Sequence, residues 1–158
     1  MVSLEVLRKC PLFSELSAEE LDQVAAICQE ETFEAGSLIF GQDEIAQKLY
    51  ILQAGRITLC MYLRSDIEPD ADVCIEESQP GRVFGWSALV KQKRFTASAV
   101  AVDRVSAISI EGDRLNALFE TNPHIGFLVM RRLADVISDR LRLTRRAEAG
   151  GALSAAGS

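Results

Sequence analysis

The chain has 158 residues, of which 48% are hydrophobic and 25% are charged. These fractions are close to those of globular proteins, so they exclude wholesale disorder, and the length predicts one domain with a sizeable core. The formal net charge of −6 disfavours attraction of the whole chain to nucleic acid. No run of 18 apolar residues is present, and residues 1–13 lack the apolar stretch of a signal peptide, so we expect a cytoplasmic protein without a membrane span.

The cysteine and histidine content limits disulfide and metal chemistry. The four cysteines lie far apart in the sequence and form no Cys-x-x-Cys pair: Cys10, Cys28, Cys60 and Cys74. This spacing predicts buried free thiols rather than a disulfide framework or a metal site. The single histidine, His124, excludes sites that need several imidazoles, and we expect it to be an exposed first-turn helix residue rather than a haem ligand.

Two helices are predicted before residue 30. Ser17 and Glu20 have the spacing of a capping box, in which a hydroxyl and a carboxylate satisfy backbone amides at the start of a helix. The apolar residues that follow have helical spacing: Leu21, Val24, Ala25 and Cys28. We therefore expect an amphipathic helix over 18–29, and a shorter helix over 3–9 that ends before Pro11.

Between residues 30 and 110 the sequence has the pattern of short strands. Apolar or alternating runs are separated by turn-forming pairs such as Ala35-Gly36 and Pro80-Gly81. The eight runs are 31–34, 37–40, 48–53, 56–64, 72–77, 82–84, 95–102 and 104–110. Short strands at this spacing predict a compact antiparallel sandwich or barrel rather than a parallel α/β sheet.

Helical periodicity returns after residue 110. Asp113 is a candidate cap for a short helix that reaches Phe119, and Asn122-Pro123 predicts the start of a longer helix over 123–146. The last ten residues, 149–158, are rich in Gly, Ala and Ser and predict a flexible tail. The expected architecture is an α+β domain over residues 1–148, with N-terminal helices, a β-roll over 30–110 and C-terminal helices over 113–146.

Three glycine-containing motifs stand in a distinctive order within this pattern. They are Phe33-x-x-Gly36-x-x-Ile39, Tyr50-Ile51-x-x-x-Gly55-Arg56-Ile57 and Pro80-Gly81-x-x-Phe84-Gly85. Their order and spacing resemble the cyclic nucleotide-binding domain of catabolite activator proteins, protein kinase A regulatory subunits and gated channels, over about residues 6–145. The resemblance implies an antiparallel β-roll of the double-stranded β-helix or jelly-roll type, and a regulatory domain in signal transduction.

The resemblance places the family's phosphate-binding cassette at residues 84–100. The ligand-site residues that it implies are Phe84, Gly85, Trp86, Ser87, Ala88, Leu89, Arg94, Phe95, Thr96 and Ser98. In the family, a short helix directs backbone N–H groups at the phosphate, a glutamate accepts from the ribose 2′-hydroxyl, and an arginine pairs with the phosphate. Here Trp86 stands at the glutamate position and Phe95 at the arginine position, with Arg94 one place earlier. We therefore expect cyclic AMP and cyclic GMP to bind weakly or not at all.

Several cassette residues have two interpretations from the sequence. Arg94 would reach a phosphate only if the preceding loop absorbed a shift of one residue, because such a shift turns a strand side chain to the opposite face. Trp86 is either a platform for a stacked base or a side chain that fills the ligand's space. The cationic loop 91–94 is either an anion-attracting rim or a solvated loop. Thr96 and Ser98 bond either a ligand or the neighbouring backbone.

The predicted C-terminal helix has a heptad seam. Its residues are Met130, Ala134, Ile137, Leu141 and Thr144, and Leu128, Leu133 and Val136 lie beside it. This stripe is wider than docking on one barrel requires, so we expect a homodimer through Met130, Ile137 and Leu141; packing of both stripes on the chain's own barrel is the alternative. The six arginines at 131, 132, 140, 142, 145 and 146 predict ion pairs and solubility rather than nucleic-acid binding.

The predicted function is that of a small-molecule sensor. The candidate ligand is a cyclic nucleotide or another small anion, to which the C-terminal helix would respond. Two alternatives remain open: a ligand-free module that binds an unidentified protein partner, and the sensor half of a catabolite-activator-type transcription regulator without its DNA-binding head. An enzyme is disfavoured, because no nucleophile–base pair, metal set or carboxylate dyad stands out in the sequence.

Overall fold

A computed structural model describes the backbone of residues 2–63, 71–91 and 93–157, and the side chains in these ranges except at 62, 63, 71, 72 and 144–157. Its elements are, in chain order, α1 (Leu4–Lys9), η1 (Pro11–Phe13), α2 (Ala18–Ala25), β1 (Cys28–Phe33), β2 (Leu38–Phe40), β3 (Lys48–Ala54), β4 (Ile57–Leu63), β5 (Ala71–Glu77), β6 (Val83–Phe84), η2 (Trp86–Leu89), β7 (Ser98–Ala101), β8 (Val105–Glu111), α3 (Gly112–Thr121) and α4 (Pro123–Gly157). This order of helices, strands and helices is the one predicted from the sequence.

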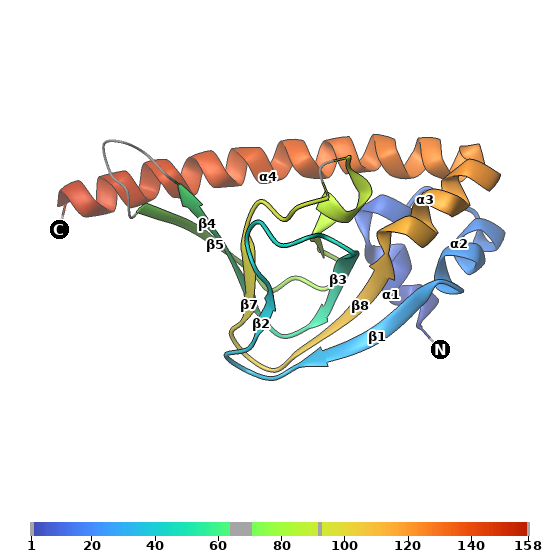
Figure 1. Ribbon diagram of the computed structural model, residues 1–158, viewed down its shortest axis with the longest axis horizontal. Coiled ribbons are helices and arrows are strands. Elements are labelled where there is room, and N and C mark those ends of the chain that lie inside the picture. Colours follow the sequence, from blue (N-terminus) through green and yellow to red (C-terminus); the bar gives the residue numbers. More distant parts are fainter. Residues whose placement is uncertain (1, 64–70, 92, 158) are drawn as a thin grey trace.

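The strands form two antiparallel sheets. Within the described ranges, each sheet has four strands, in the orders β1-β8-β3-β6 and β2-β7-β4-β5. Figure 1 shows the strands of the second sheet at the end of the molecule that lies farther from the N-terminus, with α4 along one side of both sheets. The predicted α+β fold with an antiparallel β-roll is therefore confirmed.

The central layer of the molecule is the sheet β1-β8-β3-β6, in which β3 and β8 are buried on both faces. Successive side chains of a strand point to opposite faces. Leu49 and Ile51 of β3 accordingly join the core beneath the helices, whereas Tyr50 and Leu52 join the core between the two sheets. This double burial explains why these strands have continuous rather than alternating apolar sequences.

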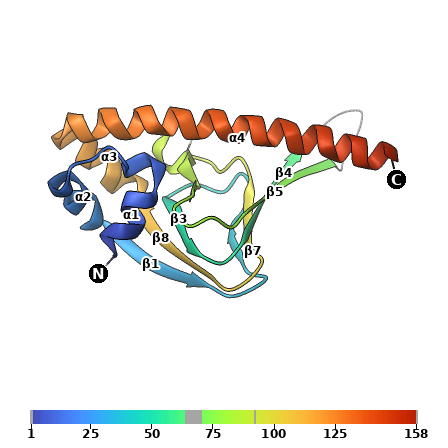
Figure 2. The same ribbon diagram turned by 180° about the vertical axis from the view of Figure 1, so that it is seen from behind.

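The helical layer covers one end of the central sheet. Figure 2 shows α1, α2 and α3 gathered against the first half of α4. The predicted capping box is present, because the Ser17 hydroxyl accepts from the Glu20 amide at 3.2 Å and the Glu20 carboxylate accepts from the Ser17 amide at 2.9 Å. None of the helices in the described part of the chain has the length and hydropathy needed to cross a bilayer.

Some predicted boundaries were wrong. α2 ends at Ala25 rather than at residue 29, because β1 begins at Cys28 and pairs with β8. β7 begins at Ser98 rather than at residue 95, since the chain before it forms an isolated bridge between Ile45 and Arg94. The strand predicted over 56–64 has its last residue outside the described ranges.

The last two helices also differ from the prediction. α3 begins at Gly112, directly after β8, so Glu111 rather than Asp113 occupies the N-cap, and α3 extends to Thr121. α4 has 35 residues and continues to Gly157, so helical backbone covers most of the segment that the sequence predicted as a flexible tail. That segment is rich in alanine, the strongest helix former, which offsets its glycines.

The prediction of four free thiols was wrong for two of them. Cys60 of β4 and Cys74 of β5 lie directly opposite each other in the antiparallel ladder, with their Cα atoms 4.1 Å apart, and form a disulfide. This pairing depends on the strand register, which the spacing of the cysteines does not reveal. Cys10 and Cys28 are free, and burial raises the pKa of each thiol to about 12.

Candidate functional site

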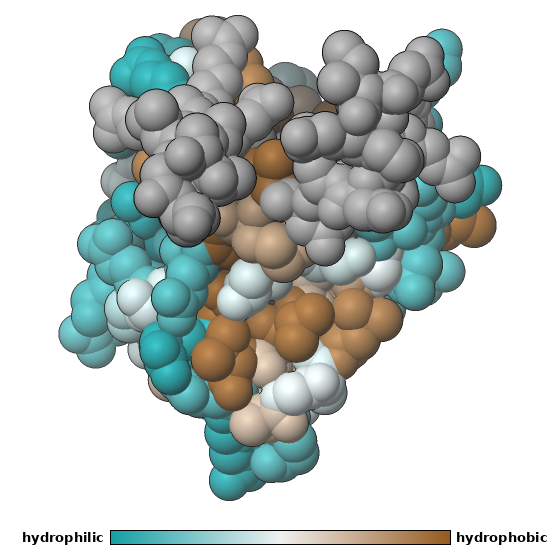
Figure 3. Space-filling view, turned by 90° about the vertical axis from the view of Figure 1, so that its left-hand side faces the viewer, coloured by the Kyte–Doolittle hydropathy of each residue, from teal (hydrophilic) through white to brown (hydrophobic). Residues whose placement is uncertain are grey.

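A pocket lies between η2, the segment before β7, strands β4 and β5, and α4. Its wall includes Leu59 and Met61 of β4, Val73 and Ile75 of β5, and Arg140 of α4. The centres of water molecules can occupy about 70 Å³ of it, whereas a single water needs about 10–15 Å³. Figure 3 shows apolar side chains gathered between hydrophilic flanks on the end of the molecule that carries β4 and β5.

Aromatic side chains form the inner part of this pocket. The rings of Phe40 and Phe95 stack with their centroids 3.7 Å apart and their planes at 14°. Phe84 stacks on Tyr50 at 5.3 Å and lies 6.1 Å from Phe40. Phe95, which the sequence predicts at the family's arginine position, is only 5% exposed and is part of an aromatic cluster in the core between the sheets.

Gly85 shapes the turn that carries η2 into the pocket. Its φ of +76° lies in the left-handed region, which glycine adopts without strain. A β-carbon at this position would also approach Phe95 and Phe40 to 3.2 and 3.3 Å. At the other end of η2, a β-carbon on Gly112 would overlap the carbonyl oxygen of Ala88, so α3 packs directly on the cassette. Both glycines let the backbone hold Trp86 and Ser87 at the pocket wall.

Six of the ten predicted cassette residues line the pocket. They are Phe84, Gly85, Trp86, Ser87, Phe95 and Thr96. Ala88 and Leu89 are buried in the two cores. The Ser98 hydroxyl accepts a hydrogen bond from the Gln42 amide at 2.9 Å, so it bonds the neighbouring backbone, which was one of its two interpretations.

The cations of the loop before β7 lie outside the pocket. Arg94 is exposed, and its guanidinium donates to the carbonyl of Asp43 at 2.7 Å. Lys93 pairs with Asp113 of α3. Because Phe95 faces the pocket and Arg94 faces away, the loop has not absorbed the one-residue shift that would have placed the arginine inside.

Arg140 also lines the pocket, which its sequence context did not predict. Its side chain is only 11% exposed, with a guanidinium nitrogen 3.2 Å from a carboxylate oxygen of Glu77, itself 10% exposed. The guanidinium carbon lies 5.3 Å from the centroid of the Trp86 ring, and the group donates to the carbonyl of Val83 at 3.4 Å. Burial lowers the pKa of Arg140, against the opposing effect of Glu77. This buried pair joins α4 to the cassette and to β5.

A signal for Arg140 was present in the sequence. The apolar residues Val129, Leu133 and Val136 pack on the core, and Arg140 continues their spacing by four residues. A charged residue on the inward stripe of a helix is rarely buried unless it is paired. The prediction that Arg140 belongs to a set of solvated arginines was therefore wrong.

The opposite stripe of α4 is exposed. Met130, Ile137 and Leu141 are 42, 37 and 51% exposed, and Phe127 is 61% exposed. The seam residues predicted for a dimer are therefore not used by the chain's own barrel, in contrast to Leu128 and Leu133, which are buried. Thr144, the last predicted seam residue, lies outside the residues whose side chains the structure describes.

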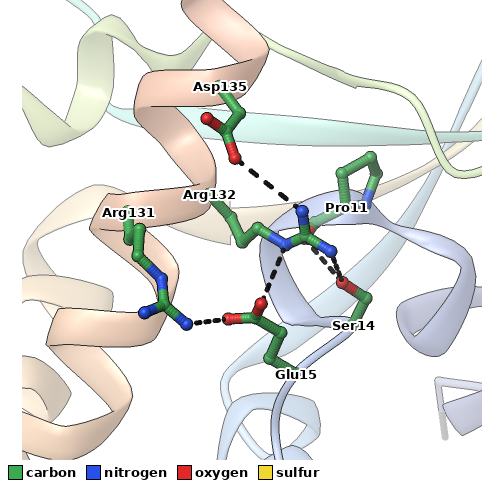
Figure 4. Close-up of polar contacts among 6 residues, drawn as sticks. All are labelled: Pro11, Ser14, Glu15, Arg131, Arg132 and Asp135. Atoms are coloured by element: carbon green, nitrogen blue, oxygen red, sulfur yellow. Dashed lines mark hydrogen bonds and ion pairs between the residues drawn. The ribbon is translucent and has the colours of Figure 1, made fainter.

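Ion pairs hold the first half of α4 on the N-terminal segment. Figure 4 shows Glu15 between Arg131, at 2.7 Å, and Arg132, at 3.6 Å, while Arg132 also donates to the Ser14 hydroxyl at 3.2 Å. The hydrogen bond from Arg131 lowers the pKa of Glu15. His124, exposed as predicted, lies 2.6 Å from a carboxylate oxygen of Glu20. In the described part of the chain, no cluster of His, Cys, Asp and Glu side chains could hold a metal ion.

The chain is similar to several known proteins. A family model described as the cyclic nucleotide-binding domain matches residues 30–122. Glutaminase 1 of Bradyrhizobium diazoefficiens is 30% identical over 85% of this chain and 21% of its own length. The cyclic AMP receptor protein of Thermus thermophilus is 29% identical over 86% of this chain and 59% of its own length, so the chain spans less than two thirds of either relative. A crystal structure from Geobacter metallireducens GS-15, assigned as a cyclic nucleotide-binding protein, has a TM-score of 0.74 and 33% identity, and covers 89% of this chain and 99% of that chain.

Proposed function

The chain belongs to the cyclic nucleotide-binding domain family, and on this premise we propose that it is a regulatory domain whose pocket senses a small molecule and whose α4 responds. The observation that carries the proposal is the position of Arg140. This residue of α4 lines the pocket, contacts Trp86 of the cassette and pairs with Glu77 of β5. A ligand that displaces Trp86 must therefore alter the contacts that hold α4. The domain itself is proposed to be non-enzymatic.

Cyclic AMP and cyclic GMP are proposed to bind weakly or not at all. Trp86 and Phe95 replace the two side chains that would bond the ribose hydroxyl and the phosphate, and Arg94 is directed at Asp43. A charge-assisted hydrogen bond contributes about 1.5–3 kcal/mol, so the loss of both costs about 3–6 kcal/mol. At 1.4 kcal/mol per tenfold, the affinity falls by about 10²- to 10⁴-fold.

Titration calorimetry tests this part of the proposal. We expect no measurable heat with either nucleotide, and we expect binding to return in the double variant Trp86→Glu, Phe95→Arg. A micromolar dissociation constant for cyclic AMP that Arg94→Ala abolishes would overturn it. Native mass spectrometry of the purified chain adds a direct count of subunits and reveals any retained small molecule.

Dimerisation through α4 is proposed from its exposed stripe. Met130, Ile137 and Leu141 follow the heptad spacing of a helix–helix seam, and each is more than a third exposed in the single chain. Sedimentation is expected to give a dimer that Ile137→Asp converts to a monomer. The matched control is Ala117→Asp on the exposed face of α3, which should leave the dimer intact. A wild-type monomer at tens of micromolar, on the order of common assay concentrations, would reject the interface.

A ligand-free protein-interaction module is the second candidate. The stacked Phe40 and Phe95 rings, which occupy the inner pocket, are the observation that favours it. It differs from the sensor in one measurable respect, since no small molecule of any class should then bind in the pocket.

A further inference from the structure

We propose that the pocket takes a small, uncharged aromatic molecule of about one ring in place of a cyclic nucleotide. This inference rests on the proposed function, because it takes the pocket as the sensing site and names the chemistry of its ligand. It is carried by three properties of the described wall: its apolar surface, the pairing of its one charged side chain, and its size.

The apolar surface comes from two opposed pairs of side chains and from the aromatic cluster. In the β4–β5 ladder Leu59 lies opposite Ile75 and Met61 lies opposite Val73, so all four side chains share the face that lines the pocket. None of these four carries a strong hydrogen-bonding group. A sugar placed against them would lose its hydration without replacement bonds, which is unfavourable. A ring gains contact with the same surface.

The one charged side chain of the described wall is already paired, with a carboxylate that Arg82 also approaches to 3.9 Å. Arg140 is the one ionisable side chain among the residues that line the pocket in the described part of the chain. It lies 3.2 Å from Glu77, and both side chains are about nine-tenths buried. An anionic ligand would have to compete with this carboxylate for the guanidinium and would itself lose water. The hydroxyl-bearing residues Ser87 and Thr96 suit a neutral polar substituent on the ring instead.

The size of the pocket limits the ligand to about one ring. Its volume of about 70 Å³ is about half that of a cavity of about 150 Å³ known to bind benzene, so even a single ring enters only when a side chain of the wall moves. Met61 provides the adjustment, because methionine is unbranched and changes rotamer readily. Thr96 is exposed and Ala97 is half-exposed, so the ligand enters and leaves along this edge. A cyclic nucleotide, with a fused base, a ribose and a phosphate, exceeds this space.

The ring would lie beside Trp86, which is the only tryptophan of the chain. The Arg140 guanidinium lies over the ring of Trp86. Binding of an aromatic molecule is therefore visible in the fluorescence of one residue. The same contact links the occupied pocket to α4.

Two probes that share a 4-fluorophenyl ring and carry either a neutral or an anionic one-carbon substituent test the ligand class. The full chain is titrated with 4-fluorobenzyl alcohol and with 4-fluorobenzoate, followed by ¹⁹F NMR and by Trp86 fluorescence, with cyclic AMP as a third titrant. We expect saturable binding of the alcohol, at least tenfold tighter than the benzoate. Ala97→Leu fills the pocket edge and should weaken the alcohol at least tenfold, whereas the control Ala117→Leu on α3 should not. Ala97→Val replaces the leucine variant if the latter does not fold.

The outcomes separate this inference from the proposed function. Equal or tighter binding of the benzoate, or binding that Ala97→Leu leaves unchanged, overturns the neutral aromatic class. Tight binding of cyclic AMP overturns the class and leaves the sensor intact. Amide hydrogen exchange of α4 is measured with and without the alcohol. Binding of the alcohol without a change in this exchange supports the neutral aromatic class and rejects the proposed response of α4. Failure of all three titrants to bind overturns the neutral aromatic class.

Discussion

Replacing Arg140 tests whether the buried pair with Glu77 holds α4 on the pocket. Arg140→Met keeps an unbranched apolar stem but leaves the Glu77 carboxylate buried without its nearest cation. Removing one partner of a buried ion pair costs about 3–5 kcal/mol. The lower end applies here, because Arg82 remains 3.9 Å from the same carboxylate. We expect a loss of about 3 kcal/mol, which for a chain of this size lowers Tm by about 6–12 °C.

The assay is urea unfolding followed by circular dichroism, since Trp86 fluorescence is itself altered by the substitution. Arg142→Met is the matched control: Arg142 is 71% exposed and pairs with Asp139 on its own helix at 3.9 Å. An exposed pair of this kind contributes less than about 0.5 kcal/mol. The double variant Arg140→Met, Glu77→Gln removes the uncompensated charge and should recover about 2 kcal/mol. If Arg140→Met costs no more than Arg142→Met, or if the double variant recovers nothing, the pair does not act as described.

Three further predictions follow from separate contacts. The double variant Cys60→Ser, Cys74→Ser removes the disulfide that closes a loop with a sequence separation of 14. Its free energy of unfolding should be lower by about 3 kcal/mol, and a reducing agent should have no further effect on it. Gly112→Ala should destabilise the fold and shift Trp86 fluorescence, because the added β-carbon meets the Ala88 carbonyl. Gly36→Ala should act through backbone strain alone, because nothing lies within 4 Å of a β-carbon at that position. Hydrogen bonds from Arg131 and from the Ser17 amide lower the pKa values of Glu15 and Glu20, respectively. The stabilisation from these bonds is present above the ordinary pKa of 4.5 and is lost as the pH falls through the lowered pKa. The double variant Glu15→Gln, Glu20→Gln should reduce the loss of Tm at acid pH, and an unchanged loss would contradict the assignment.

The fold was predictable because its strands are short and its turns are marked. Each predicted run between residues 30 and 110 corresponds to a strand, although β1 and β7 begin at other positions. The capping box at Ser17 gave the start of α2 correctly, since capping is local chemistry. The end of α4 was not predictable from its glycines, because the surrounding alanines favour helix continuation.

The site was predictable only where it is contiguous in sequence. Trp86 and Phe95, which the glycine motifs predict for the cassette, line the same pocket. Met61, Val73 and Arg140 were missed, since pairing between strands and packing of a distant helix bring them to the pocket. The same reason explains the disulfide, which depends on the β4–β5 register rather than on cysteine spacing.

The two attachments of α4 give it the geometry of a lever. Figure 1 shows α4 running from the N-terminal helices to the end of the molecule that carries β4 and β5, and Arg140 of α4 lines the pocket on the way. The ion pair between Arg131 and Glu15 is the fixed point of this motion. At 1.5 Å per residue, Arg140 lies about 14 Å from Arg131 along the helix axis, and Gly157 lies about 39 Å from it. A sideways displacement of about 1 Å at Arg140 therefore becomes about 3 Å at Gly157 when the helix moves as a rigid rod. The far end of α4 is thus the place to attach a label that reports on the pocket.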